Sequence, residues 1–173
     1  ATDIVQRYTS EAVYNGLSML HVNIDNMLLA GQDIYLALVA NRNLNGLLAR
    51  KIDLDDRIDF YDVQQFLSQM RTLALSYEQV DSIYIYDIND GILYTSSKTA
   101  LALSGYETSY VYQQAVKMEK FGVWMPNHPV EDSRWVVNED LVTVAYPIMR
   151  LAAQERIGYI FINIPRKSFL TYL

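Results

Sequence analysis

The stretch Val80-Asp-Ser-Ile-Tyr-Ile-Tyr-Asp-Ile-Asn-Asp-Gly-Ile-Leu-Tyr-Thr-Ser-Ser97 decides the fold. It predicts two antiparallel strands joined by a tight turn, because the Asn-Asp-Gly in its middle tolerates a positive φ. Side chains alternate across a strand, so Ile83 and Ile85 share one face and the neighbouring tyrosines share the other. The aliphatic face is suited to a core. The tyrosine face is suited to a partly solvent-exposed surface or to a binding site.

The composition describes one domain. The 173 residues can form a sizeable core, because 51% of them are hydrophobic and only 20% are charged. The net charge of -6 disfavours nucleic acid as a partner, since phosphate binding needs a basic face. The absence of cysteine excludes disulfides and thiol catalysis. No stretch approaches the roughly 20 apolar residues that cross a bilayer. Both ends are expected to be helical, so we expect a piece of a longer protein, cut between two membrane spans.

The first forty residues carry a heptad pattern. Its apolar residues are spaced alternately four and three apart, which predicts one face of a long helix: Val13, Leu17, Leu20, Ile24, Met27, Gly31, Ile34 and Leu38. Two interpretations of this helix stay open and are compatible with each other. It can pack on a sheet, or it can be a stalk from a membrane that pairs with a second copy.

The remaining patterns complete an α+β layout of about five antiparallel strands with the long helix on one face. The expected elements are a turn or short helix within 41–54, a second helix over 60–77, a third over 106–120, strands at 122–125, 141–149 and 156–164, and a last helix from 168. We expect one domain over 1–173. Its parts are the N-terminal helices (1–78), the sheet-bearing core (79–165) and the start of a C-terminal helix (166–173).

Taken together, these segments resemble the Cache family, the extracellular PAS-like sensor domains of bacterial receptors. The hairpin Ile83–Ser96 is similar to the first strand pair of that family. The runs Leu141–Ile148 and Ile157–Ile164 are similar to its closing pair, in which a strand ending in Pro precedes a Gly-led strand. The resemblance implies a PAS-like sheet and a small-molecule ligand. The resemblance is closest to the sensor regions of Gram-positive histidine kinases. Many of those sensors have two PAS-like modules in tandem, whereas the strands expected in this chain are enough for only one module.

The same resemblance implies a ligand pocket on the side of the sheet opposite the long helix. Alternation places aromatic side chains on that side, and Trp-bearing segments are expected to cover it. Asn163 stands where amino-acid-binding relatives often have an Asp for the ligand ammonium, which puts amino-acid binding in doubt and leaves sugars, organic acids or amino-acid-like compounds. The predicted ligand-binding residues are Tyr84, Tyr86, Trp124, Arg134, Trp135, Tyr146, Tyr159, Phe161 and Asn163.

Other chemistry finds little support, and we expect no catalytic residue, metal or cofactor. The aspartates of 53–59 lack the Gly and Glu of an EF-hand loop, and His21 and His128 are isolated. The acidic residues of 131–140 are not placed across a cleft by any pattern. No nucleophile elbow, phosphate loop or dinucleotide fingerprint is present.

We therefore predict a ligand-sensing domain on the extracellular side of the cell membrane. It would belong to a signal transduction protein, with a two-component histidine kinase as the expected output. We also expect a homodimer through the N-terminal helix. Two alternatives remain: a dimerisation or interaction module that senses nothing, and an intracellular PAS-like or GAF-like sensor.

Overall fold

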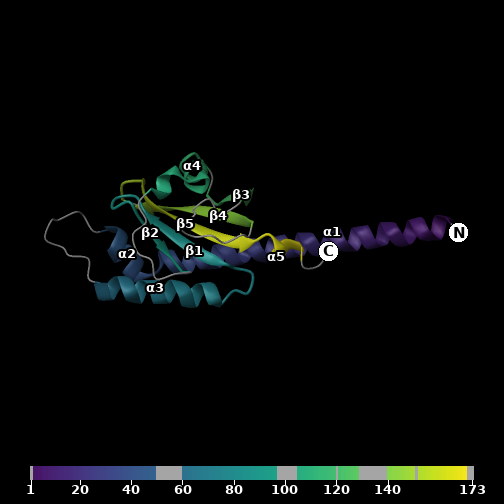
Figure 1. The fold of residues 1–173 in the computed structure, drawn as a ribbon, viewed down its shortest axis with the longest axis horizontal. Coiled ribbons are helices and arrows are strands. Elements are labelled where there is room, and N and C mark those ends of the chain that lie inside the picture. The colour runs from purple at the N-terminus through teal and green to yellow at the C-terminus, as the bar shows by residue number, and fades with distance from the viewer. Residues whose placement is uncertain are drawn as a thin grey trace.

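The structure is a computed structural model that describes residues 2–49, 60–96, 105–119, 121–128, 140–150 and 152–170. Its sheet has five strands, and the helices flank it on both faces (Figure 1). In chain order the elements are α1 (Thr2–Val39), α2 (Arg42–Ala49), α3 (Phe60–Leu75), β1 (Ser82–Asp87), β2 (Ile92–Thr95), the 3-10 turn η1 (Tyr106–Thr108), α4 (Tyr110–Val116), β3 (Val123–His128), β4 (Leu141–Arg150), β5 (Glu155–Pro165) and α5 (Lys167–Leu170).

The sheet is antiparallel throughout, with strand order β2-β1-β5-β4-β3. The last strand of the chain lies at its centre, between the first hairpin and β4. The hairpin forms as predicted, and Gly91 has a φ of 64° in its turn, where a side chain would be strained. The predicted α+β fold with about five antiparallel strands is confirmed.

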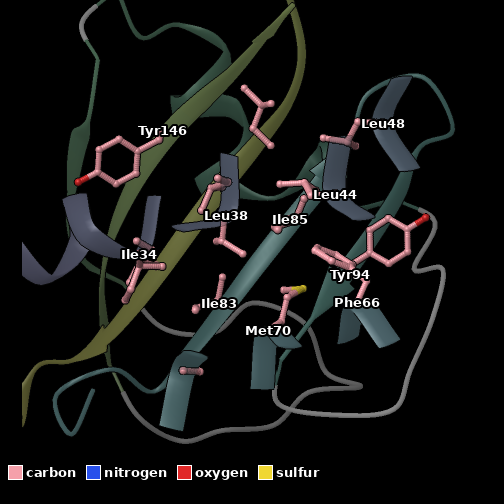
Figure 2. Close-up of a cluster of buried hydrophobic side chains, with 14 of the residues drawn as sticks. Ile34, Leu38, Leu44, Leu48, Phe66, Met70, Ile83, Ile85, Tyr94 and Tyr146 are labelled. Carbon is pink, nitrogen blue, oxygen red and sulfur yellow. The ribbon is translucent and has the colours of Figure 1, made fainter. Parts of the chain in front are cut away.

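The larger hydrophobic core lies between the sheet and α1, α2 and α3 (Figures 1 and 2). Ile83 and Ile85 on β1 point into it, as the alternation predicted. From α1 it receives Met27, Ile34 and Leu38, all part of the heptad seam. The packing of the long helix on the sheet is therefore confirmed for its second half.

The first half of α1 projects beyond the sheet (Figure 1). With 38 residues the helix is roughly 57 Å long at 1.5 Å per residue, which exceeds the length of the sheet. Side chains of residues 2–15 are all exposed. None of the helices in the described ranges is both long and apolar enough to cross a bilayer.

Two predicted elements differ in their bounds. The helix expected over 106–120 is interrupted, because Ser109 is extended with φ -68° and ψ 151°. Its side chain accepts a hydrogen bond from the backbone N–H of Tyr112, so it caps α4 and separates this helix from η1. The short strand expected at 122–125 extends to His128 as β3. The aspartates of 53–59 lie outside the described residues.

Candidate functional site

The face of the sheet opposite α1 carries a group of six contacting aromatic rings. α4 lies over this face (Figure 1). We call this group the aromatic cluster: Tyr84, Tyr86, Tyr106, Tyr112, Tyr159 and Phe161. β1 and β5 supply the floor through alternate positions, and the register pairs Tyr84 with Phe161 and Tyr86 with Tyr159. Aromatic residues of β1, β5, η1 and α4 therefore meet at one place.

The rings meet mostly edge to face. Tyr86 and Tyr112 have centroids 4.8 Å apart at 68°, and Tyr112 and Tyr159 have centroids 5.7 Å apart at 85°. Tyr106 reaches Phe161 at 5.7 Å. Such arrangements match the quadrupoles of aromatic rings and contribute about 0.5–1.5 kcal/mol per pair beyond area burial. Tyr84, Tyr106 and Tyr112 are only half-buried, so the cluster has a partly exposed side.

One carboxylate lies at the edge of the aromatic cluster. The hydroxyl of Tyr86 donates a 3.3 Å hydrogen bond to Oε2 of Glu107, which is exposed on η1. Burial, with the nearby Glu107 charge as the next cause, raises the pKa of Tyr86 to about 12. Burial also raises the pKa of Tyr112. These phenols therefore stay protonated at neutral pH and can act as hydrogen-bond donors.

Arg156 joins the cluster's floor to its cover. Its guanidinium lies 6.0 Å from the centroid of the Tyr159 ring. It donates hydrogen bonds to the backbone carbonyls of Ala115 and Val116, each at 3.4 Å, and of Met118. A cation at a helix C-terminus satisfies carbonyls that lack a helical partner and favours the helix dipole. This side chain of β5 thus fixes the end of α4.

A row of polar side chains crosses the same face of the sheet next to the cluster. Thr143 donates a 2.8 Å hydrogen bond to Oδ1 of Asn163, and Nδ2 of Asn163 donates a 3.0 Å bond to Oγ of Ser82. The three residues are register partners on β4, β5 and β1, and all are buried. The oxygen of the amide and one of its N–H groups are therefore used in binding three strands together.

Five of the nine predicted site residues share this face. Tyr84, Tyr86, Tyr159 and Phe161 belong to the aromatic cluster, and Asn163 lies in the polar row beside it. Arg134 and Trp135 lie outside the described residues.

Trp124 and Tyr146 were expected on the ligand side and lie instead on the α1 side. Trp124 pairs with Val144, whose side chain is in the core beneath α1, and its ring contacts Phe169 with centroids 6.2 Å apart. Tyr146 is buried in the same core (Figure 2). Its ring centroid lies 4.9 Å from that of Tyr35 on α1. The physical reason is strand phase: Met125 and Ala145 take the positions that face α4.

Three residues of the site were missed at the sequence level: Tyr106, Glu107 and Tyr112. They lie within the segment that was read as one continuous helix. Tyr106 and Tyr112 are six apart, which would place them on different faces of a helix. The extended Ser109 between them brings both rings over the sheet. Within the ranges that the structure describes, no group of three or more acidic, His or Cys side chains is arranged to hold a metal ion.

Comparison with known proteins identifies the fold and gives no sequence relative. No protein-family model matches the chain, and no curated protein matches it in sequence. Solved structures do match it. The sensory domain of the Campylobacter jejuni chemoreceptor Tlp3 with isoleucine bound has a TM-score of 0.62 and 15% identity, covering 91% of this chain and 60% of its own.

Two other solved domains are similar. The extracellular domain of the protein described as histidine kinase vpHK1S-Z8 has a TM-score of 0.65 at 13% identity, over 96% of this chain and 60% of its own. A domain from Vibrio parahaemolyticus, assigned to the sensory box/GGDEF family, has a TM-score of 0.65 at 12% identity, over 87% of this chain and 58% of its own. The chain thus spans about three-fifths of the structures it matches. At these identities the similarity establishes the fold.

Proposed function

We propose, from a fold that the chain shares with extracellular PAS-like sensor domains of the Cache type, that it is the ligand-sensing part of a membrane-bound signalling protein. The observation that carries the proposal is the aromatic cluster between the sheet and α4, three of whose six rings are partly exposed. In this proposal the domain faces the outside of the cell, the output is a histidine kinase, and the domain itself catalyses no reaction.

The ligand in this proposal is a small molecule bound on the α4 side. The Tlp3 domain was solved with isoleucine bound, which supports an amino-acid-sized ligand. In this chain the Asn163 amide is engaged with Thr143 and Ser82, so ligand recognition would fall to tyrosine hydroxyls and Glu107. Sugars, organic acids and amino-acid-like compounds remain the classes to test, and the predicted contribution of Arg134 and Trp135 remains part of the proposal.

The path from ligand to output runs along β5. This strand carries Tyr159 and Phe161 in the floor of the cluster and Arg156 at the end of α4. It leads directly into α5, which lies against α1 (Figure 1). A ligand that favours one position of α4 would shift β5 and therefore α5 relative to α1. The size of the shift in population is limited by the ligand's differential affinity for the two positions.

A thermal-shift screen of this domain tests the proposal. A ligand at 100 times its dissociation constant adds about 2.7 kcal/mol to the free energy of unfolding, which is easily visible. We expect a hit among sugars, amino acids, amines or organic acids. Tyr112→Ala should reduce the shift, whereas Leu75→Ala, at an exposed residue of α3, should leave it unchanged. A screen without any hit would count against sensing, and equal shifts in both variants would move the site away from the aromatic cluster.

We further propose a homodimer through the projecting half of α1. This segment exposes large apolar side chains, among them Ile4, Val5, Tyr8, Val13 and Tyr14. The second half of the heptad seam is used for packing on the sheet, so a second copy would meet the first half. Sedimentation should show a dimer that Val5→Glu weakens. Leu75→Glu, at an exposed apolar residue on α3, is the matched control and should leave the dimer intact.

A further inference from the structure

The ring of Tyr146 on β4 lies against two glycines from distant parts of the chain. A Cβ on Gly31 of α1 would lie 3.0 Å from the Tyr146 hydroxyl oxygen, and a Cβ on Gly122, directly before β3, would lie 2.9 Å from Cε1 of the same ring. Both distances are shorter than an ordinary van der Waals contact, so the lack of a side chain lets each backbone approach the ring. Tyr146 is buried, and Figure 2 shows its side chain reaching from β4 toward α1. One side chain therefore contacts both segments.

Two further rings pack around Tyr146. The centroid of Tyr35 on α1 lies 4.9 Å from that of Tyr146, and the centroid of Phe121, which precedes Gly122, lies 5.4 Å away. The rings of Tyr35 and Phe121 also contact each other, with centroids 4.7 Å apart at 82°. We call these five residues the Tyr146 group: Gly31, Tyr35, Phe121, Gly122 and Tyr146. Within it, α1 and the segment before β3 each supply one ring and one glycine.

The segment that carries Phe121 begins on the other face of the sheet. α4 ends at Val116, and Met118 after it is still buried in the core on the α4 face. Phe121, three residues further on, contacts α1, so the chain passes here from the α4 face to the α1 face (Figure 1). Three residues span at most about 10 Å even when fully extended, which leaves the segment little slack. Its start is held by Arg156, which donates to the carbonyl of Met118.

We propose that Tyr146 couples the α4 face of the sheet to α1, so that a shift of α4 changes the position of α1. The inference rests on the proposed function, because it names a residue through which a ligand on the α4 face would act on α1. It adds a second route to the one along β5 and α5. This route reaches α1 on the part of the helix that packs on the sheet, between Gly31 and Tyr35.

Close packing is what allows the Tyr146 group to transmit a shift. Protein interiors have few voids and low compressibility, so a displaced group moves its neighbours. A shift of the end of α4 toward the group would press Gly122 against the Tyr146 ring, and the ring would press on Gly31. α1 continues beyond the sheet, so its displacement is exported from the domain. Such coupling is reciprocal: holding α1 in one position would change the affinity for a ligand by the same factor.

Substitution of Gly122 tests the coupling without a ligand. Gly122→Ala places a methyl group against the Tyr146 ring, and the amide NMR signal of Gly31, on α1, should shift in response. Gly105→Ala is the matched control. Both glycines have a positive φ, 80° at Gly122 and 91° at Gly105, but Gly105 has open space where a Cβ would lie. Its substitution should leave the Gly31 signal in place. The signal of Gly91, in the β1–β2 turn, should not move in the Gly122 variant.

Tyr146→Phe decides whether the shift passes through Tyr146. Phenylalanine keeps the ring beside Gly122 and removes the hydroxyl oxygen that lies next to Gly31. In this background the effect of Gly122→Ala on the Gly31 signal should be smaller by about twofold or more, because the two positions are then no longer joined by a close contact. A Gly31 signal that ignores Gly122→Ala, or an equal shift in both backgrounds, would overturn the inference.

Arg156→Met is a second perturbation, which serves also if Gly122→Ala does not fold. It releases the carbonyls at the end of α4 and should likewise shift the Gly31 signal. Phe121→Ala removes a ring of the Tyr146 group and should reduce this effect. Phe169→Ala removes a ring of α5 that contacts Trp124 and should leave the effect unchanged. No response of Gly31 to Arg156→Met, or a response that is lost in the Phe169 variant, would also overturn the inference.

These measurements use no ligand, so they are independent of the thermal-shift screen. Failure of the coupling would leave the proposed sensing function to be judged by that screen. A screen without a hit would count against sensing, and the NMR signal of Gly31 would still decide whether Tyr146 couples the two faces.

Discussion

The hydroxyl of Thr143 donates a 2.8 Å hydrogen bond to the amide oxygen of Asn163, and both side chains are buried on the α4 face of the sheet. The bond connects β4 to β5, and Asn163 continues the connection to β1 through Ser82. A buried polar group is costly unless it is paired, so each member of this row stabilises the fold only while its neighbours are present. The row therefore holds the three central strands in one register beside the aromatic cluster.

Asn163→Ala should destabilise the domain by about 1–3 kcal/mol, because two buried partners lose hydrogen bonds at once. Urea unfolding followed by circular dichroism measures the change. Asn26→Ala, at an exposed position on α1, is the matched control and should stay within about 0.5 kcal/mol of the wild type. Equal effects of the two substitutions would contradict the role assigned to the polar row.

Asp87 should make stability fall as pH rises. Burial raises the pKa of its carboxyl from the ordinary 3.8 to about 6. The hydrogen bonds that the carboxylate accepts from the backbone amides of Asn89 and Asp90 lower the pKa, but burial has the larger effect. Between these two values the folded state holds the proton and the unfolded chain releases it. The free energy of unfolding should therefore fall from pH 4 to pH 6, by an amount on the order of 2–3 kcal/mol from this group.

Asp87→Asn should remove most of that pH dependence. The amide keeps the oxygen that accepts from the turn and carries no charge to bury, so the variant should be more stable than the wild type at pH 7.5 and similar at pH 4.5. Urea titrations at several pH values measure this. Asp33→Asn, at an exposed aspartate on α1, should keep the wild-type profile. A variant of Asp87 that is less stable at pH 7.5 would show that the charge is favourable in the fold.

Gly31 and Tyr146 should be energetically coupled. A Cβ on Gly31 would lie 3.0 Å from the Tyr146 hydroxyl oxygen, so Gly31→Ala alone should destabilise the domain. Tyr146→Phe removes that oxygen. In its background Gly31→Ala should be neutral or stabilising, because Ala favours a helix over Gly by about 0.8–1 kcal/mol. A double-mutant cycle should give a coupling of about 0.5–3 kcal/mol, and a coupling of zero would contradict the contact.

Arg156→Met should loosen α4 without disturbing the sheet. The loss of a charged donor from the helix C-terminus is expected to lower stability by about 1–2 kcal/mol. Hydrogen exchange should accelerate in residues 110–118 and stay slow in β5. Arg150→Met removes a part-exposed arginine whose contact with Glu155 is 3.9 Å, and it should have little effect. Unchanged exchange in α4 of the Arg156 variant would argue against the capping role.

Local patterns were sufficient where a single element determines the outcome. The alternation of Ile83 and Ile85 with tyrosines predicted both faces of β1, because period 2 is a property of the strand itself. The seam residues Met27, Ile34 and Leu38 predicted the buried face of α1 in the same way. Both periods follow from backbone geometry and need no knowledge of distant residues.

Patterns failed where two faces look alike. β4 alternates Val144 and Tyr146 with Thr143 and Ala145, and neither set identifies the core beneath α1. The phase was therefore assigned by residue type, which placed Tyr146 and Trp124 on the wrong face. The break in the helix at Ser109 was also missed. A serine at this position is compatible with a helix N-cap, but the residue type does not show that the turn before it is irregular.

By itself the sequence determined the α+β class, the hairpin, the buried stripe of α1 and four rings of the aromatic cluster, because each follows from periodicity within one element. Only the tertiary structure decided that β5 lies at the sheet centre, that Asn163 binds Thr143 and Ser82, and that Tyr106 fills the middle of the cluster. Asn163 is 20 positions from Thr143 and 81 positions from Ser82, and the place of Tyr106 depends on a turn that leaves helical geometry. No local period carries that information, because it arises only when separate elements pack against one another.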